Sequence, residues 1–303
     1  MTSQPGISVV VPAFNAAPWI GETLATVFAQ TSPADEVIVV DDGSTDATLA
    51  ALDPWRDSLT VIRQDNAGCG FAFNTGIRAA SSEYVALCPA DDLWVPQKLE
   101  YQRATLAADP AIDVSFGAAV NFGLSEAPYP RPSRIGRLDR AVLLREMFAA
   151  NVVPDPSVVV RRDLVLSLGG FVEEVGEDYE LWMRAIREGA VFHFDERLLV
   201  RLRQHGGNLS AQALSIWSMN KRVHEAAADD IGDPGLAARV LAHDEAVIGR
   251  CLLGLGRVDE ARTALRRSLR HRLTASALAV WCLVRLPGAK WALERMHRRR
   301  TTR

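Results

Sequence analysis

The sequence predicts an α/β protein with a mainly parallel sheet flanked by helices, followed by an α-helical C-terminal appendage. Short β-branched runs alternate with stretches whose apolar residues recur at helical spacing, which indicates right-handed β-α-β units. Acidic, amide and glycine residues gather where these runs end. From about residue 211 onward the pattern is helical only, so within the 303 residues we expect a domain at 1–215 and an appendage at 216–303.

The first part of the chain repeats a strand, a turn and a helix. Strands are expected at residues 7–11, 36–40, 59–64 and 84–89, and helices follow the first three of them. After the second strand, Ser44 or Thr45 is expected to cap a helix that has Asp46 in its first turn. A glycine-rich loop precedes the helix that follows the third strand.

The next part predicts three more strands, at residues 113–120, 156–161 and 197–204, and helices at 96–108 and 162–171. Residues 124–140 are rich in Pro, Arg, Ser and Gly and are expected to form a loop over the sheet edge. A further helix has Glu177, Asp178 and Glu180 in its first turn and a core face that includes Leu181.

Polar residues, together with proline and glycine, follow four of the predicted strands. They are Pro12 and Asn15; Asp41, Asp42, Gly43 and Ser44; Asp65, Asn66 and Gly68; and Asp91 and Asp92. Each set alone is ordinary for turns and caps. The carboxyl ends of parallel strands meet at one edge of a sheet, where such folds bind ligands, so together the four sets predict a binding site.

The motifs resemble those of family 2 glycosyltransferases, which have the Rossmann-like GT-A fold, over about residues 6–210. They are VVVPAFNAAPWIGETLATVFAQT, EVIVVDDGSTDAT, DNAGCGFAFNTGIRAASSEYVAL, ADDLWVPQKLE, GGFVEEVGEDYELWMRA and RLRQHGGNLS, in this order. The resemblance implies transfer of a sugar from a nucleotide-diphosphate donor to an acceptor hydroxyl. It also implies inversion at the anomeric carbon, Mg²⁺ or Mn²⁺ as cofactor, and a role in cell-envelope or extracellular polysaccharide synthesis.

The resemblance also assigns roles to individual residues. Asp91 and Asp92 are expected to hold the metal on the donor diphosphate, since hard cations prefer carboxylate oxygens. Asp178 is the expected general base and Glu177 its acidic neighbour. The residues expected to contact the donor are Pro12, Ala13, Asn15, Asp41, Asp42, Asn66, Asn74, Arg203 and His205.

Structural alternatives stay open for several of these residues. Glu177, Asp178 and Glu180 also complement a helix dipole without any catalytic role. Arg203 and His205 also fit the exposed end of a strand, and His193 is read as a strand residue. Trp94 and Trp182 either stack on a sugar or pack beneath helices.

Two positions depart from the family pattern. Pro89 stands where a further carboxylate is common, so Asp91 is expected to carry most of the metal coordination. Phe73 replaces a common arginine. These changes support an alternative, a nucleotide-sugar-binding protein of the same fold with little or no catalysis. A nucleotidyltransferase is disfavoured because PAFNAAPW lacks a glycine-rich basic loop.

Composition argues against several other classes of protein. With 48% hydrophobic residues, 23% charged residues and a net charge of -3, neither disorder nor nucleic-acid binding is indicated. The four cysteines show no Cys-x-x-Cys pair, which argues against zinc and disulfide frameworks and favours a reducing cytosol. No signal peptide and no membrane span is expected, so the protein is predicted to be cytoplasmic, at most peripheral at the cytoplasmic face of the membrane.

The C-terminal region is strongly basic. Residues 257–303 contain 13 lysines and arginines and three acids, a net charge of +10, so residues 1–256 carry -13. Within it, the apolar part of ASALAVWCLVRLPG is about 11 residues long, which suits an interface more than a span, with Trp281 and Trp291 at headgroup level. Membrane contact would suit a lipid-linked glycan acceptor. The alternative is that this helix packs onto the catalytic domain and its arginines are solvated.

Overall fold

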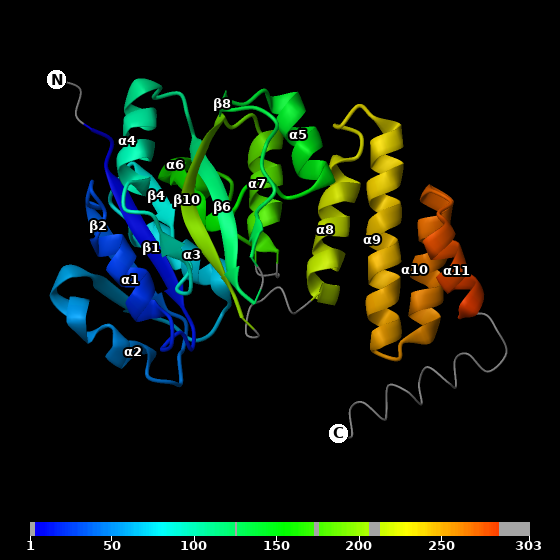
Figure 1. Ribbon diagram of the computed structural model, residues 1–303, viewed down its shortest axis with the longest axis horizontal. Coiled ribbons are helices and arrows are strands. Elements are labelled where there is room, and N and C mark those ends of the chain that lie inside the picture. The colour runs from blue at the N-terminus through cyan, green and yellow to red at the C-terminus, as the bar shows by residue number, and fades with distance from the viewer. Residues whose placement is uncertain (1–3, 125, 173–175, 206–212, 285–303) are drawn as a thin grey trace. The chain divides into compact units, whose positions relative to one another are not determined.

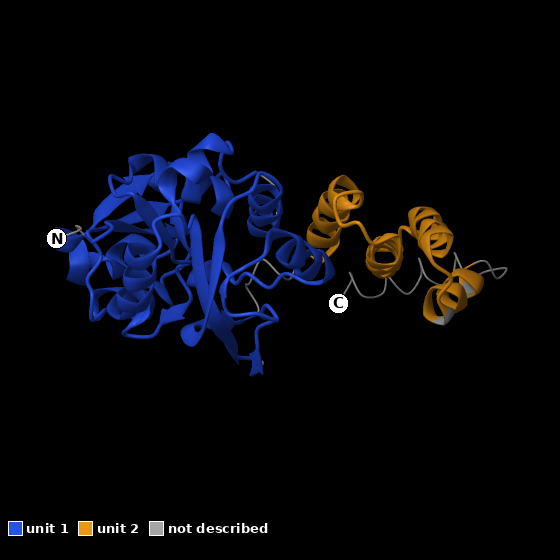
Figure 2. Ribbon diagram, turned by 90° about the horizontal axis from the view of Figure 1, so that it is seen from above, with its two compact units in different colours: residues 1–208 blue, residues 209–303 orange. Residues whose placement is uncertain are grey.

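A computed structural model describes residues 4–124, 126–172, 176–205 and 213–284 of the chain. The chain forms two compact units, residues 1–208 and 209–303, shown in different colours in Figure 2. The boundary expected near residue 215 stays a prediction.

The first unit is built on one sheet with the order β3-β2-β1-β4-β9-β6-β10-β5, in which β7 also pairs with β6 and β8 with β10 (Figure 1). The strands are β1 (Ile7–Ala13), β2 (Glu36–Asp41), β3 (Thr60–Arg63), β4 (Tyr84–Leu87), β5 (Leu93–Trp94), β6 (Val114–Gly123), β7 (Ala127–Pro128), β8 (Gly136–Arg137), β9 (Val159–Arg161) and β10 (Phe192–Gln204). β1 to β4, β6 and β10 run in one direction, and β9 lies antiparallel between β4 and β6. The mainly parallel sheet predicted from the sequence is confirmed.

Helices cover both faces of this sheet. They are α1 (Ile20–Phe28), α2 (Thr48–Ala51), α3 (Cys69–Ala79), α4 (Lys98–Ala108), α5 (Arg140–Ala149), α6 (Arg162–Ser167) and α7 (Glu177–Arg187), with short 3₁₀ turns η1 (Asp53–Ser58) and η2 (Asp155–Ser157). Buried side chains of α1 and α4 share a core cluster with one face of β1. α3 packs on the opposite face so closely that a Cβ at Gly76 would lie 2.3 Å from Val10 Cγ1.

Three local expectations were wrong. Residues 124–140, expected to form a loop, contain β7 and β8, and α5 begins at Arg140, where Asp139 caps it by accepting a hydrogen bond from Val142 N (3.0 Å). β10 begins at Phe192, upstream of the expected start at 197, and continues through two irregularities in its pairing with β6. α2 begins only at Thr48, because Ala47 is its N-cap.

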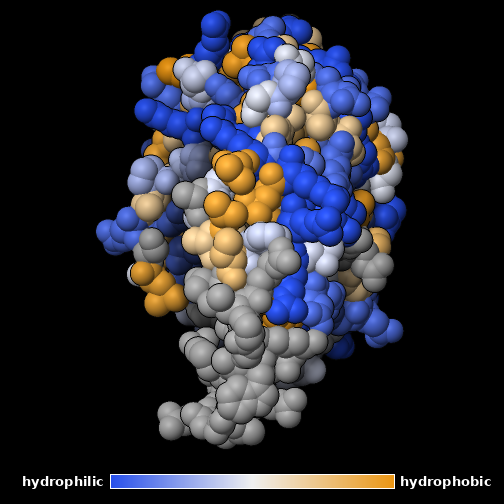
Figure 3. All heavy atoms as spheres, turned by 90° about the vertical axis from the view of Figure 1, so that its right-hand side faces the viewer, coloured by the Kyte–Doolittle hydropathy of each residue, from blue (hydrophilic) through white to orange (hydrophobic). Residues whose placement is uncertain are grey.

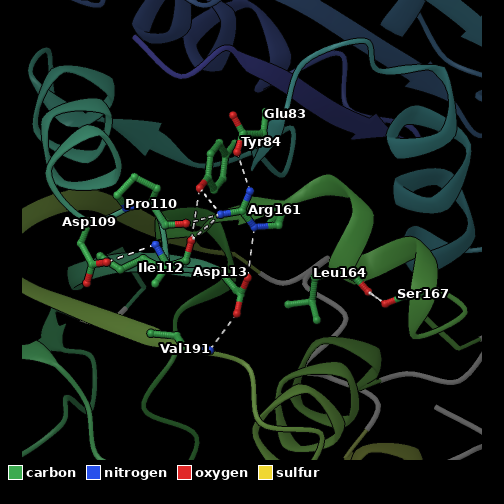
Figure 4. A network of polar contacts seen from close by, with 11 residues as sticks. Glu83, Tyr84, Asp109, Pro110, Ile112, Asp113, Arg161, Leu164, Ser167 and Val191 are labelled. Carbon is green, nitrogen blue, oxygen red and sulfur yellow. Dashed lines mark hydrogen bonds and ion pairs between the residues drawn. The ribbon is translucent and has the colours of Figure 1, made fainter. Parts of the chain in front are cut away.

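Arg161 ties the reversed strand β9 to its neighbours (Figure 4). Its guanidinium donates to Asp113 Oδ1 (3.1 Å), Glu83 Oε1 (2.5 Å), the Tyr84 hydroxyl (2.6 Å) and Pro110 O (2.7 Å). Glu83 and Tyr84 stand at the start of β4, so this network secures the sheet at the edge opposite its carboxyl ends.

The second unit contains α8 (Ala213–Ala227), α9 (Pro234–Gly254), α10 (Val258–His271) and α11 (Ala275–Leu283). α9 and α10 share a core of Ile248, Leu252, Ala261 and Ala264. Among the helices of the described residues, none is both long enough and apolar enough to cross a membrane.

Candidate functional site

The carboxyl ends of β1 and β2 are joined by a hydrogen bond from Asp42 N to Ala13 O (2.8 Å). Pro12 and Ala13 are buried at this point, and Asp41 is fully buried behind them. Asp41 accepts hydrogen bonds from Ser44 N (3.2 Å) and Arg63 Nε (3.3 Å). The exposed guanidinium of Arg63 therefore stands at the rim of the predicted donor site.

Asp42 organises the loop that follows β3. Its Oδ1 accepts from Gln64 Nε2 (2.7 Å) and Ala67 N (2.9 Å), and its Oδ2 accepts from Gly68 N (2.8 Å). Both carboxylate oxygens of this buried side chain are thus used inside the protein. Asn66 lies exposed on the loop that they hold.

Asn15 links the first two loops of this edge. It has a positive φ of 49°, and its N–H donates to Ser44 Oγ (3.0 Å) while its Oδ1 accepts from Thr45 N (2.8 Å). Ser44 and Thr45, expected to cap a helix, serve this link instead. The neighbouring Phe14 is 50% exposed. Its ring offers an aromatic surface on which a base could stack. The sequence analysis did not single out this residue.

Asp91 and Asp92 lie against the end of β10, more than a hundred residues away in the chain. Arg203 donates from its backbone N–H to Asp92 Oδ1 (2.8 Å) and from Nε to the Asp91 carbonyl (2.9 Å). His205 Nε2 lies 3.0 Å from Asp91 Oδ2. The structure therefore brings together four residues that the sequence predicted separately.

Glu22 of α1 and Trp19, the N-cap residue of that helix, support this group. Arg203 also contacts Glu22 Oε2 (2.5 Å), and the Trp19 ring stacks on His205 with a centroid separation of 5.0 Å. Asp92 is almost fully buried, and its burial, followed by the charge of Asp91, raises its pKa well above the usual range. Asp91 is more accessible, with 25% of its side chain exposed, and is the better placed of the two to meet a ligand.

The chemistry of these groups fits a divalent cation bound with a diphosphate. No cluster of three or more His, Cys, Asp and Glu side chains suited to a metal occurs in the described parts of the chain. Mg²⁺ usually takes only one or two carboxylates and completes its shell with phosphates and water. Asp91 can supply such a carboxylate, which is a ligand that both Mg²⁺ and Mn²⁺ prefer, and the imidazole of His205 lies beside it.

Glu177 and Asp178 begin α7, directly after Gly176, whose φ is 96°. Glu177 Oε2 accepts from Gly176 N (2.9 Å), and Asp178 Oδ2 accepts a longer hydrogen bond from Asn151 Nδ2 (3.4 Å). A Cβ at Gly70 would lie 2.9 Å from Glu177 Cγ, so the start of α3 packs against this turn.

At this position burial affects the pKa values of the two carboxyl groups more strongly than the helix N-terminus does. Burial raises the pKa of Glu177 to about 7, and the charge of Asp178 contributes in the same direction. Burial also raises the pKa of Asp178, although hydrogen bonds from Tyr179 N, its own N–H and Asn151 work against that rise. Both groups are thus shifted toward the pH at which a general base exchanges protons.

Asp155 is a third carboxylate of this group, and the sequence analysis missed it. It opens η2, and burial, followed by the charges of Asp178 and Glu177, raises its pKa well above the usual range. Its Oδ1 is buried and has no hydrogen-bond partner among the described residues. The only signal in the sequence was a Pro-Asp-Pro turn before a strand, which is also typical of a plain loop.

Other predicted residues are occupied by packing. Asn74 donates from Nδ2 to Phe171 O (2.8 Å) and accepts at Oδ1 from Phe171 N (2.8 Å), so its amide clamps the loop before α7. Phe73 is buried and stacks on Phe171. Trp94 and Trp182 are buried as well. Their rings therefore pack inside the protein and are not available to stack on a sugar.

Comparison with known proteins gives a family for most of the first unit. Residues 8–165 match the family described as "Glycosyl transferase family 2". An uncharacterized glycosyltransferase of Rickettsia typhi, RT0329, is 29% identical over 225 residues, which cover 71% of this chain and 69% of that protein. The putative teichuronic acid biosynthesis glycosyltransferase TuaG of Bacillus subtilis is 36% identical over 33% of this chain and 41% of its own length. The amylovoran biosynthesis glycosyltransferase AmsE of Erwinia amylovora is 29% identical over 55% of this chain and 64% of its own length.

Solved structures agree on the fold. S. aureus TarS, residues 1–349, in complex with UDP-GlcNAc has a TM-score of 0.64 at 19% identity and covers 97% of this chain and 92% of its own. The mannosyltransferase PcManGT from Pyrobaculum calidifontis, in complex with GDP-Man and Mn²⁺, has a TM-score of 0.57 at 26% identity and covers 99% of this chain and 84% of its own.

Proposed function

The chain belongs to glycosyl transferase family 2, and on that basis we propose that it transfers a sugar from a nucleotide-diphosphate donor to an acceptor hydroxyl with inversion. The observation that carries this proposal is the arrangement of two acidic groups in the first unit. Asp91 and Asp92 lie beside two basic side chains, whereas Glu177, Asp178 and Asp155 form a partly buried acidic group with raised pKa values. The charge of Asp92 also acts on Asp155, so the two groups lie near each other.

Donor binding is assigned to the edge formed by β1, β2 and the loop after β3. Phe14 offers an exposed ring to a base, and Asn15 and Asp42 hold the surrounding loops in place. PcManGT and TarS, which share the fold, bind GDP-Man and UDP-GlcNAc respectively, which supports a nucleotide sugar as donor. Asp41 and Asn66 belong to the same edge as proposed donor-site residues. Asn74 is proposed to support the site indirectly, because both groups of its amide bind the main chain of Phe171.

Mg²⁺ or Mn²⁺ would be held by Asp91, with Asp92 behind it and His205 beside it. When bound, such a cation neutralises the negative charge that develops on the leaving diphosphate. Arg203 is tied to the main chain of Asp91 and to Asp92, and it orders this end of the site before any ligand arrives.

The proton of the acceptor hydroxyl passes to Asp178 as the acceptor oxygen bonds to the anomeric carbon. The bond from that carbon to the diphosphate breaks at the same time, and its electron pair leaves with the diphosphate. Asn151 holds one oxygen of Asp178, and Glu177 with its pKa of about 7 is the adjacent acid. Partial burial of the base raises its pKa toward neutrality.

The acceptor is assigned to a cell-envelope or extracellular glycan, carried on a lipid, at the cytoplasmic face of the membrane. The names of TuaG and AmsE refer to teichuronic acid and amylovoran biosynthesis, which supports a polysaccharide product. The second candidate is a nucleotide-sugar-binding protein with little turnover. Pro89, which offers no metal ligand, and the buried Phe73 favour that alternative.

Thermal unfolding with UDP, GDP and their sugar conjugates, with and without Mn²⁺, tests donor binding. A ligand at about 100 times its Kd stabilises by about 2.7 kcal/mol, which raises the Tm of a unit of this size by roughly 5–10 °C. Asp91→Ala should remove the Mn²⁺-dependent part of the shift, and Asp92→Ala should remove less of it. Asp163→Ala, which alters a carboxylate on α6 with 86% of its side chain exposed, is the matched control and should retain the full shift.

The result of this experiment separates the candidates. If no nucleotide raises the Tm, the proposed donor site is wrong. If nucleotides bind but no donor is turned over with any glycan acceptor, the binding-protein alternative replaces the transferase.

A further inference from the structure

The second unit contains a basic groove of about 830 Å³ between α10 and α11. It is lined by Arg262, Thr263, Arg266, Arg267, Arg270 and Trp281. Two of these arginines already have partners within the unit. Arg262 donates to Val284 O from Nε (2.9 Å) and Nη2 (2.6 Å), and Arg267 lies 3.8 Å from the buried Glu245.

Arg266 and Arg270 are the cations that the groove leaves available. Both are exposed, and neither has a hydrogen-bond or ion-pair partner in the described part of the chain. They are four residues apart on α10, so they project from the same face of the helix about one turn apart. Two guanidinium groups at that spacing can bracket one phosphate, each with two parallel N–H donors.

The same end of the unit also exposes apolar surface. Leu273 is 72% exposed and Leu278 on α11 is 37% exposed, and Ala279 and Cys282 are exposed on the same helix. Trp281 lines the basic groove, three residues beyond Leu278. Figure 3 shows the result, an apolar patch directly beside strongly hydrophilic atoms on the face of α10 and α11.

We propose that the basic groove binds the phosphate of an anionic phospholipid, with the exposed face of α11 lying in the membrane interface. A soluble polyanion would account for the arginines but not for an exposed apolar helix next to them. An interfacial helix needs both features, an apolar face and flanking cations, and aromatic rings at headgroup level strengthen its binding. The net charge of +10 over residues 257–303 acts in the same direction.

This inference concerns where the acceptor of the proposed reaction is met. It rests on the proposed function only in taking that acceptor to be a lipid-linked glycan. The groove would hold the enzyme at the surface where such an acceptor is embedded. Binding to vesicles requires no turnover, so a failure of membrane binding and a failure of sugar transfer are observed separately.

The test is flotation of the full chain with vesicles of phosphatidylcholine alone or with roughly one third phosphatidylglycerol. We expect binding to the anionic vesicles only, weakening as salt is added. Arg266→Gln with Arg270→Gln should lower the partition coefficient about 30-fold, at about fivefold for each arginine near an anionic surface. Glutamine preserves helix propensity, so the variant is expected to fold.

Matched variants make the test specific. Arg239→Gln with Arg250→Gln removes the same charge from exposed positions on α9 and should change the partition by less than about threefold. Brominated lipids should quench tryptophan fluorescence less in Trp281→Phe than in Trp217→Phe, because the ring of Trp281 lies in the interface.

Three outcomes would overturn the proposal. The first is equal binding of the wild type and the Arg266 and Arg270 variant to anionic vesicles. The second is an equal loss in both double variants, which would indicate net charge alone. The third is tight binding of soluble inorganic polyphosphate without binding of vesicles, which would make the groove a site for a soluble polyanion.

Discussion

Replacement of Lys98 by methionine is expected to stabilise the first unit, and to do so most strongly near neutral pH. Lys98 is completely buried at the start of α4, just after the Asp91–Asp92 motif. Its Nζ donates to Gln102 Oε1 (2.9 Å) and lies 4.0 Å from the centroid of the Trp94 ring. Burial lowers the pKa of Lys98 from 10.5 to about 7.

The magnitude follows from that pKa. A fall from 10.5 to about 7 corresponds to a cost of about 5 kcal/mol for burying the ammonium, present in full below pH 7. Methionine has a similar volume and removes this cost, but it leaves Gln102 Oε1 without a donor, at about 1–3 kcal/mol. The cation–π contact with Trp94 is also lost, at about 1–2 kcal/mol. We expect the free energy of unfolding to rise by up to about 3 kcal/mol at pH 6.5.

The sign of the pH dependence distinguishes this account from simple repacking. Between pH 7 and 10.5 the unfolded chain holds the lysine proton and the folded protein does not, so wild-type stability gains from this group as pH rises. At pH 9.5 the remaining cost is only about 1.4 kcal/mol, so Lys98→Met should be no more stable than the wild type there.

Urea unfolding at pH 6.5, 8 and 9.5, followed by circular dichroism, measures the difference. Lys98→Arg is the matched variant, because arginine stays charged at every one of these pH values and its cost should not fall. A gain from methionine that is constant or larger at pH 9.5 would show that the buried charge is not its source.

Three further changes probe the site. Asp178→Asn should lower turnover, measured as nucleoside diphosphate release, about 10²–10⁴-fold while donor affinity in calorimetry is unchanged; full activity would place the base elsewhere. Asn74→Ala should cost about 2–4 kcal/mol in urea unfolding, because the buried N–H and C=O of Phe171 lose their partner; a cost below about 0.5 kcal/mol would contradict the clamp. Asp155→Asn should raise the Tm more at pH 7.5 than at pH 4.5. A carboxyl whose pKa is raised in the folded protein lowers the protein's stability as the pH rises above the pKa of that group in the unfolded chain. An equal or opposite change in Tm would count against the burial of Asp155 in an acidic site.

Much of the fold could be predicted because its signals are local. The β-branched runs of β1, β2 and β4 and the apolar spacing of α1 and α4 need only near neighbours to be recognised. The carboxyl-edge rule then placed Asp41, Asp42, Asp91 and Asp92 at one edge without any coordinates. α5 was missed because its residues lie beside a Pro- and Gly-rich segment, and the antiparallel direction of β9 has no signature in a strand of three residues.

Other properties of the site were decided only by the tertiary structure, because they depend on contacts between residues far apart in the chain and on the burial of side chains. The sequence by itself determined the α/β class, the family resemblance and the identity of the acidic motifs, since these lie in short contiguous stretches. It did not show that Arg203 and His205 meet Asp91, that Asn74 is used up by Phe171, or that Asp155 joins Asp178. Nor could it decide whether the helix N-terminus or desolvation governs Glu177, because the extent of burial is a property of the packed protein and not of neighbouring residues in the chain.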